Sequence, residues 1–160
     1  MKKAKINDLV KLDRYQVFLF TCPVSIPLNF ASHPWFVCIK NGEISRWEVR
    51  FEKNKINPII GKYLHFNSLP PFSGIEMLQF IPKKFLWPAT LLGYVEGDAN
   101  SLAKKIIDFI ETLPKNYIYR DQYSFFGPNS NTYAQWVLNN FPEFKIKLPW
   151  NSFGKNFKIK

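Results

Sequence analysis

The sequence predicts a single α+β domain in which helices cover one side of an antiparallel sheet. Short runs of aromatic and β-branched residues fill the first half of the 160-residue chain, and helical patterns appear only in the second half. Strands followed by helices favour this class over the alternating order of a doubly wound fold. Twelve prolines punctuate the chain, and no repeat or linker divides it, so we expect one domain over residues 1–160.

The predicted strands are bounded by Gly, Pro or Asn, which are typical turn residues. Residues 15–22 (YQVFLFTC) are aromatic and β-branched and should form a buried strand. A hairpin is expected where Asn41-Gly42 separates residues 34–40 from 44–52, because this dipeptide suits a two-residue hairpin turn. The other strand candidates are residues 62–67, 75–81, 90–96 and 144–148.

The hairpin also predicts which side chains can meet across its two strands. Pairing the residues that flank the turn places His33 opposite Arg50 and Trp35 opposite Glu48. Arg50 is expected to lower the pKa of His33, and it cannot accept a hydrogen bond from the ring. Glu48 is only a diagonal neighbour of His33, so the group that would orient the ring is expected to be missing or displaced.

Two helices are predicted in the second half. Residues 101–113 carry an apolar stripe at helical spacing, made of Leu102, Ile106, Phe109, Ile110 and Leu113. Asn100 or Ser101 can cap the start of this helix, and Pro114 is expected to end it. A Tyr-rich loop (YIYRDQYSFFGP) follows, and residues 130–140 form the second helix, which ends before Pro142.

Positive charge is concentrated at the two ends of the chain. The chain holds 22 Lys and Arg against 12 Asp and Glu, a net charge of +10. Five cations meet two acids in residues 1–14, and five lysines meet no acid in residues 145–160. These basic termini, about 1–14 and 149–160, could attract nucleic acid or an anionic membrane surface. The alternative interpretation is that they are solvated lysine-rich ends with no partner.

Several classes of site are excluded by counting. Two Cys and two His are too few for a Cys-based zinc site, a disulfide framework or a multi-His metal centre, so we expect neither a metal nor another cofactor. Phosphate-loop, dinucleotide-binding and zinc-protease motifs are missing. Residues 16–31 are the most apolar early stretch, but Pro23 and Pro27 interrupt it. We therefore expect no transmembrane segment and a cytoplasmic protein.

The block GPNSNTY at residues 127–133 is the strongest candidate for a site. A helix start presents free backbone N–H groups and a partial positive charge, which suit nucleophiles and anions. Ser130 at this start and His33 at the start of the hairpin would make the minimum of a nucleophile–base pair. We expect the His33 ring to face the helix across the edge of the sheet, with Asn129 or nearby N–H groups stabilising an oxyanion.

Three blocks together resemble a bacterial family of domains of unknown function. They are SHPWF at 32–36, GPNSNTY at 127–133 and LPWNSFGKNF at 148–157. That family is recognised by a GPNSNTF-like motif and a terminal Gly-Lys-Asp/Asn-aromatic motif. The resemblance covers about residues 16–157, and it implies no established activity.

The order of these parts is also similar to circularly permuted NlpC-type papain-like proteins, the group that includes lecithin-retinol acyltransferase. In those proteins an early-strand His precedes an Asn-Cys motif that opens a later helix. The similarity implies a permuted papain-like fold with Ser130 as nucleophile and His33 as base. Glu48, the diagonal neighbour of His33, is the remaining candidate for a catalytic group. Ser130 departs from the pattern, because a helix end can ionise a Cys thiol but not a Ser hydroxyl.

Three functions remain open from the sequence. The favoured one is a catalytically weakened or inactive relative that binds a small acyl or peptide-like ligand in a Ser130/His33 cleft. The alternatives are a hydrolase or acyltransferase using Ser130 and His33, and a binder of nucleic acid or anionic surfaces through the lysine-rich termini. The predicted ligand-binding residues are Asn129, Asn131, Thr132, Trp35, Arg50 and Lys155. Alternatively, the NSNT cluster is only a helix cap and His33 only a hydrogen-bonded residue at a strand end.

Overall fold

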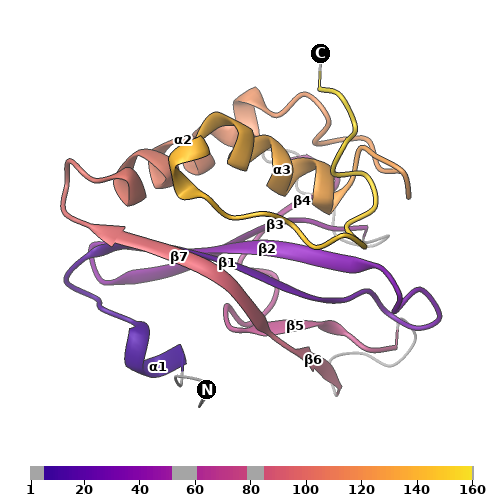
Figure 1. Ribbon diagram of the computed structural model, residues 1–160, viewed down its shortest axis with the longest axis horizontal. Coiled ribbons are helices and arrows are strands. Elements are labelled where there is room, and N and C mark those ends of the chain that lie inside the picture. Colours follow the sequence, from indigo (N-terminus) through magenta and orange to yellow (C-terminus); the bar gives the residue numbers. More distant parts are fainter. Residues whose placement is uncertain (1–5, 52–60, 79–84, 160) are drawn as a thin grey trace.

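A five-stranded antiparallel sheet forms the centre of the structure (Figure 1), a computed structural model that describes residues 6–51, 61–78 and 85–159. Its strands are β1 (Tyr15–Pro23), β2 (Ser32–Lys40), β3 (Glu43–Val49), β4 (Leu64–Phe66) and β7 (Thr90–Gly97). Their order across the sheet is β4-β3-β2-β1-β7. The described residues form a single small α+β domain, as the sequence predicts.

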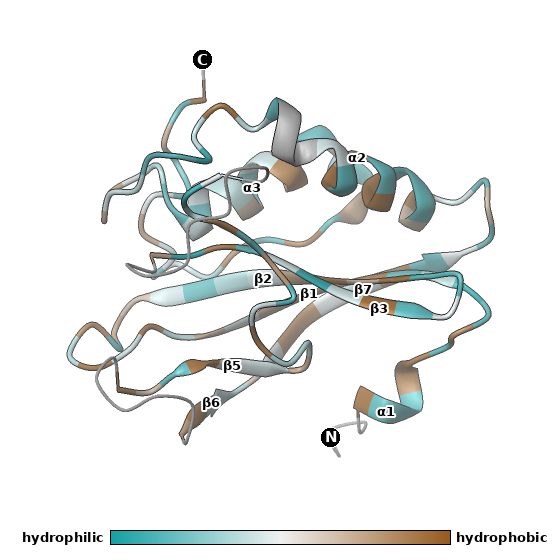
Figure 2. Cartoon of the chain, turned by 180° about the vertical axis from the view of Figure 1, so that it is seen from behind, coloured by the Kyte–Doolittle hydropathy of each residue, from teal (hydrophilic) through white to brown (hydrophobic). Residues whose placement is uncertain are grey.

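Two helices cover one face of this sheet, α2 (Leu102–Asn116) and α3 (Ser130–Asn140). Figure 2 shows the apolar residues of α2 on the side that faces the strands. Ile106 and Ile110 of α2 and Val137 of α3 are buried there with Phe36 of β2, which forms the main core. The apolar stripe at the 3.6-residue period therefore predicted the buried side of α2.

The opposite face of the sheet carries a second, smaller core. A two-stranded antiparallel sheet, β5 (Ser73–Glu76) with β6 (Leu86–Pro88), lies on this side, as does the short helix α1 (Ile6–Leu9). Phe20, Trp35 and Val37 are buried here, since alternate residues of a strand point to opposite faces. Neither α1 nor β6 was expected from the sequence.

The predicted hairpin is present with the predicted register. Lys40 pairs with Glu43 at the end of the β2–β3 ladder, and Asn41 and Gly42 both have positive φ angles, of 53° and 81°. A two-residue turn of this handedness matches the twist of the strands that it joins. The strands expected over residues 15–22 and 90–96 are confirmed as β1 and β7, and β4 lies within residues 62–67. Of the strand expected over 75–81, residues 79–81 lie outside the described residues.

The strand expected over residues 144–148 is wrong. A 3₁₀ turn, η1 (Pro142–Phe144), is followed by Lys145 in the left-handed region at φ 53°, which interrupts an extended conformation. The chain then crosses the face of β7 instead of pairing with its edge. A Cβ atom on Gly93 would lie 2.6 Å from Cδ1 of Ile146, so the missing side chain leaves room for this crossing. Phe144 and Leu148 are buried in the main core with residues of α3, so their apolar side chains do not indicate a strand here.

The helix predicted over residues 130–140 is confirmed as α3. The helix predicted over 101–113 is confirmed as α2, but it continues to Asn116 instead of ending at Pro114. A proline inside a helix removes one backbone donor and disfavours the helical conformation of the residue before it, and this local preference is overridden at the end of α2. Among the described residues, no helix is both long and apolar enough to cross a lipid bilayer.

Candidate functional site

Three segments that are distant in the sequence meet beside the start of α3: residues 32–36, 127–133 and 148–157. Ser32 Oγ lies 2.7 Å from Ser152 Oγ, and the N–H of Ser32 donates to the carbonyl oxygen of Asn151 at 3.2 Å. We call this meeting point the junction. It comprises Ser32, Asn129, Asn131, Thr132, Ser152 and Gly154.

Asn129 makes most of the polar contacts in the junction. Its Oδ1 accepts hydrogen bonds from the backbone N–H groups of Asn131 (3.0 Å) and Thr132 (3.2 Å), which caps α3. Its Nδ2 donates to three backbone carbonyl oxygens, those of Ser124 (3.1 Å), Phe125 (2.7 Å) and Phe153 (3.0 Å). One buried side chain therefore begins the helix and also holds the preceding loop and the C-terminal segment.

Asn131 and Thr132 extend these contacts. Asn131 Nδ2 donates to the carbonyl oxygens of Ser32 at 3.0 Å and Phe153 at 2.9 Å. Thr132 Oγ1 donates to the carbonyl oxygen of Gly154 at 2.8 Å. The side chains predicted to bind a ligand are buried and donate to the protein's own backbone. The capping interpretation of this block is thus correct but incomplete, because the same groups join three segments.

Ser130 is buried at the first turn of α3, and its hydroxyl interacts with Tyr123. Burial raises the pKa of the Tyr123 phenol to about 12, and the hydrogen bond with Ser130 partly opposes this rise. The hydroxyl of Tyr123 is a weak acid at this pKa and is no base for Ser130 at neutral pH. This contact therefore stabilises the loop before α3 and does not activate the serine.

His33 and Glu48 lie together in a buried ionic cluster. His33 Nε2 is 2.8 Å from Glu48 Oε2, and both side chains are almost completely inaccessible to solvent. Arg46 donates to Glu48 through Nε (3.0 Å) and Nη2 (2.8 Å), a bidentate pair. The prediction that the orienting group of His33 is missing or displaced is therefore wrong. The diagonal separation across the two strands is short enough for the Glu48 side chain to reach the ring.

The electrostatics of this cluster keep His33 neutral and Glu48 charged. Burial lowers the pKa of His33, and although the hydrogen bond that its ring donates to Glu48 opposes this, Arg46 and Arg50 add to the lowering. Burial alone would raise the pKa of Glu48, but Arg46 and the His33 hydrogen bond hold it well below its usual range. A neutral His beside a carboxylate that is already neutralised by Arg is a stable structural arrangement.

His33 and Ser130 belong to opposite sides of the sheet. His33 pairs with Cys22 of β1 and its ring stacks on Trp35 at 6.3 Å, and both neighbours belong to the second core. Because side chains alternate along a strand, His33 points towards the β5–β6 side. Ser130 begins α3, which packs on the other face. The expectation that the His33 ring faces the start of α3 is therefore wrong.

The predicted ligand residues Trp35 and Arg50 are also structural. Trp35 is fully buried, its ring lies 4.4 Å below the Arg46 guanidinium carbon, and its Nε1 donates to the carbonyl oxygen of Pro71 at 2.9 Å. Arg50 is nearly buried and pairs with Glu76 at 3.0 Å. These contacts join the five-stranded sheet to β5, through Glu76, and to the segment before it, through Pro71.

A surface hollow of about 650 Å³ lies between α3 and the C-terminal segment, which run alongside each other (Figure 1). We call it the α3 hollow. Its walls are Thr132, Gln135, Trp136, Asn139, Ile146, Lys147, Leu148, Lys155, Asn156, Phe157, Lys158 and Ile159. Among the described residues, three lysines and no acid line it. Neither His33, Glu48 nor Ser130 is among these residues, so the ligand cleft expected at Ser130 and His33 does not coincide with it.

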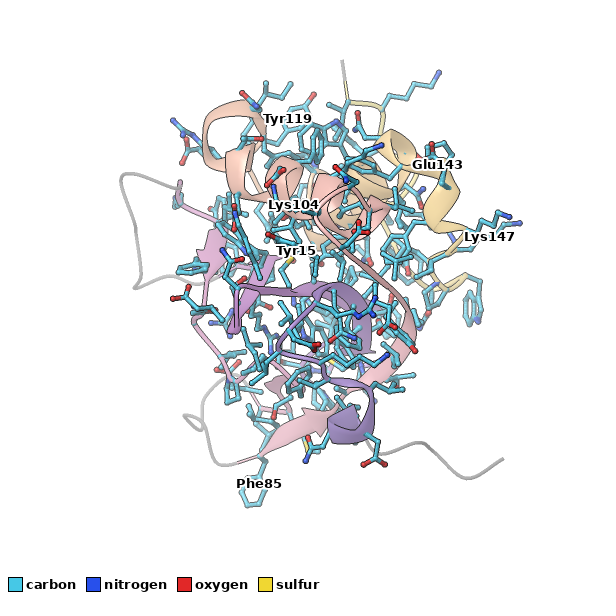
Figure 3. All side chains as sticks on the ribbon, turned by 90° about the vertical axis from the view of Figure 1, so that its left-hand side faces the viewer. Tyr15, Phe85, Lys104, Tyr119, Glu143 and Lys147 are labelled. Atoms are coloured by element: carbon cyan, nitrogen blue, oxygen red, sulfur yellow. The ribbon has the colours of Figure 1, made fainter. Side chains whose placement is uncertain are left out.

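Of the predicted ligand-binding residues, Thr132 and Lys155 line the α3 hollow. Lys155 Nζ already donates to the carbonyl oxygen of Pro149 at 2.7 Å. Lys147 is exposed and reaches outward from the surface (Figure 3). The sequence reasoning missed Gln135, Trp136 and Asn139, although they follow Thr132 at helical spacing along one face of α3. This stripe of polar and aromatic residues could have indicated the hollow from the sequence.

Other reactive groups offer little chemistry. Burial raises the pKa of Cys22 to about 12 and raises that of Cys38 as well, so both thiols stay protonated at neutral pH. Within the described ranges, no three His, Cys, Asp or Glu side chains gather closely enough to hold a metal ion.

Residues 14–157 match the family described as "Protein of unknown function (DUF3750)", and the chain belongs to this family. No curated protein shows a significant match to the chain, and no solved structure does.

Proposed function

We propose that this chain is a binding protein and that its site is the α3 hollow. The observation that carries this proposal is the lining of the hollow. Within the described part of the chain, its walls contain Lys147, Lys155 and Lys158, no acid, and apolar and aromatic side chains. A hollow of about 650 Å³ is within the range of small-molecule sites, about 300–1,000 Å³.

The chemistry of the walls indicates the kind of ligand. The lysines favour a carboxylate or a phosphate, and the amides of Gln135, Asn139 and Asn156 can bond to it or to a peptide group. Trp136 and Phe157 offer apolar surface for an acyl chain or an apolar side chain. We therefore propose a small anionic ligand with an acyl or peptide-like part, bound here instead of between Ser130 and His33.

A catalytic function is the second candidate. The 2.8 Å contact between His33 and Glu48 favours it, because a hydrolase needs a carboxylate to orient its base. The papain-like arrangement would also require the His33 ring to reach Ser130 at the start of α3. The ring is on the β5–β6 side of β2, and it is buried, so we rank catalysis below binding.

Thermal-shift and calorimetric titrations of the whole chain test the binding proposal. The probes are decyl phosphate below its micelle concentration, an N-acetylated dipeptide and inorganic phosphate. We expect decyl phosphate or the peptide to bind more tightly than inorganic phosphate, and Lys147→Glu to weaken that binding by about tenfold or more.

Lys105→Glu is the matched control, because Lys105 is exposed on α2 and does not line the hollow. It makes the same change in net charge and should leave the affinity unchanged. The proposal would be overturned if none of the three probes binds, or if Lys147→Glu and Lys105→Glu lose the same amount of affinity.

A further inference from the structure

Aromatic side chains from three segments gather at the end of the molecule where β1 ends and β2 begins. We call this group the aromatic tip; it comprises Phe30, Phe125, Phe126, Trp150 and Phe153. The ring centroids of Phe125 and Phe153 are 5.4 Å apart, and Phe30 lies 6.3 Å from Phe125 and 6.0 Å from Phe153. The loop between β1 and β2, the loop before α3 and the C-terminal turn thus share one surface.

The tip is unusually exposed for an aromatic cluster. Trp150 is 85% exposed, Phe126 is 73% exposed and Phe30 is 55% exposed. A small hollow of about 330 Å³ separates Phe126 from Trp150 and is also lined by Lys155. Single exposed apolar residues are ordinary, but a contiguous group of this kind marks an interaction surface.

The backbone beneath the tip is held by hydrogen bonds. Asn129 Nδ2 bonds to the carbonyl oxygens of Phe125 and Phe153, which carry two of the tip rings. Asn151 Nδ2 donates to the carbonyl oxygen of Phe30 at 2.9 Å. The junction therefore fixes the three segments relative to one another. The exposed rings extend from an ordered base, which lowers the conformational entropy lost when they bind.

The segments that carry the tip hold positive charge and no acid. Residues 24–31, 122–129 and 145–159 contain no Asp or Glu. Lys155 lines the small hollow of the tip, and Lys147, three residues before Trp150, extends into solvent (Figure 3). An apolar surface flanked by lysines is complementary to a surface that is apolar inside and anionic outside.

We propose that the aromatic tip docks on the surface of a bilayer that contains anionic lipids. Trp and Phe rings settle at the boundary between headgroups and acyl chains, and the lysines pair with lipid phosphates. The exposed aliphatic residues Ile26 and Leu28 lie in the same β1–β2 loop. Aliphatic side chains suit an acyl boundary but give no stacking surface to bases, which favours a membrane over single-stranded nucleic acid.

Vesicle sedimentation with the whole chain tests this proposal. The probes are phosphatidylcholine vesicles with and without about 30% phosphatidylglycerol. We expect the chain to sediment with the anionic vesicles and not with the neutral ones, and to dissociate as salt rises to about 0.5 M. Trp150→Ala should reduce the partition coefficient by about fivefold or more, since it removes a large interfacial side chain.

Leu12→Ala is the matched control for loss of an exposed apolar side chain. Leu12 is 52% exposed and precedes β1, so it lies about 30 Å from the tip along the nine-residue strand. It should bind vesicles like the unmodified chain. Both variants change exposed residues, and circular dichroism will verify that both are folded.

Three results would overturn the proposal. The first is no sedimentation with anionic vesicles, and the second is an equal effect of Trp150→Ala and Leu12→Ala. The third is binding of the chain to a fluorescent oligothymidine together with no binding to vesicles. That result would indicate that the tip binds nucleic acid. Because Trp150 does not line the α3 hollow, failure here leaves the proposed ligand site standing, and the titrations above test that site separately.

Discussion

Gly154 lies directly against the side chain of Asn129: a Cβ atom on Gly154 would be 2.5 Å from Asn129 Nδ2. Gly154 also has a φ of +89°, a conformation that other residues rarely adopt. The contact therefore requires a glycine for two independent reasons. It brings the C-terminal turn close enough for Thr132 to donate to the Gly154 carbonyl oxygen.

Gly154→Ala should lower the free energy of unfolding by about 2–4 kcal/mol, because it adds backbone strain and displaces the Asn129 amide. Urea denaturation measures this loss. Gly42→Ala is the matched control, since Gly42 also has a positive φ but its Cβ would meet only the Leu12 carbonyl oxygen at 4.0 Å. It should cost about 1 kcal/mol. Equal costs for both variants would contradict the importance of the Asn129 contact.

Asn129→Ser separates helix capping from the hydrogen bonds that this side chain donates to the preceding loop and the C-terminal segment. Serine still accepts a hydrogen bond from the first turn of α3, but it cannot donate to the carbonyl oxygens of Ser124, Phe125 and Phe153. We expect the free energy of unfolding in urea to fall by about 1–2 kcal/mol, since the part-buried carbonyl oxygens of Ser124 and Phe125 lose this donor, while that of Phe153 keeps Asn131. Asn140→Ser, at an exposed amide, should have little effect. If Asn129→Ser lowers the free energy of unfolding no more than Asn140→Ser does, Asn129 acts only as a helix cap.

The stability of the chain should fall as the solution is acidified below the usual His pKa of 6.5. The pKa of His33 is lowered in the folded state, so the unfolded chain binds more protons in this range and stability decreases with falling pH. The pKa of Glu48 is also lowered, which adds a further loss below its usual value of 4.5. His33→Gln should remove the first loss and retain the second. Thermal denaturation at a series of pH values measures both, and an unchanged profile in His33→Gln would contradict this interpretation.

Ser130 should not react as a catalytic nucleophile. Its hydroxyl interacts with Tyr123, and the His33 ring is bonded to Glu48 on the other side of the sheet. A fluorophosphonate probe should label the unmodified chain no more than Ser130→Ala. Ser152→Ala is a second buried-serine control. Labelling that disappears in both Ser130→Ala and His33→Gln would instead establish the pair and support the catalytic candidate.

The parts of the fold that depend on local pattern could be predicted from the sequence. The hairpin at Asn41-Gly42 and the helix over residues 130–140 were predicted with their boundaries nearly correct, because turn chemistry and capping act within a few residues. The strand predicted over 144–148 was wrong, because a short segment with alternating apolar residues has the same sequence pattern whether it pairs with a sheet edge or packs against a helix. The α3 hollow was missed because its walls come from two segments that meet only in the folded chain.

The sequence by itself determined the α+β class, the β2–β3 register, a capping cluster at the start of α3 and the excess of lysine at the C-terminal end. These follow from side-chain period, turn geometry and composition, which are local or additive properties. Only the tertiary structure decided that Glu48 reaches His33, that Ser130 lies on the other face of the sheet, and that aromatic rings from three segments share one exposed tip. Such relationships depend on which strand face a side chain occupies and on long-range packing, and neither is determined by residues that are neighbours in the chain.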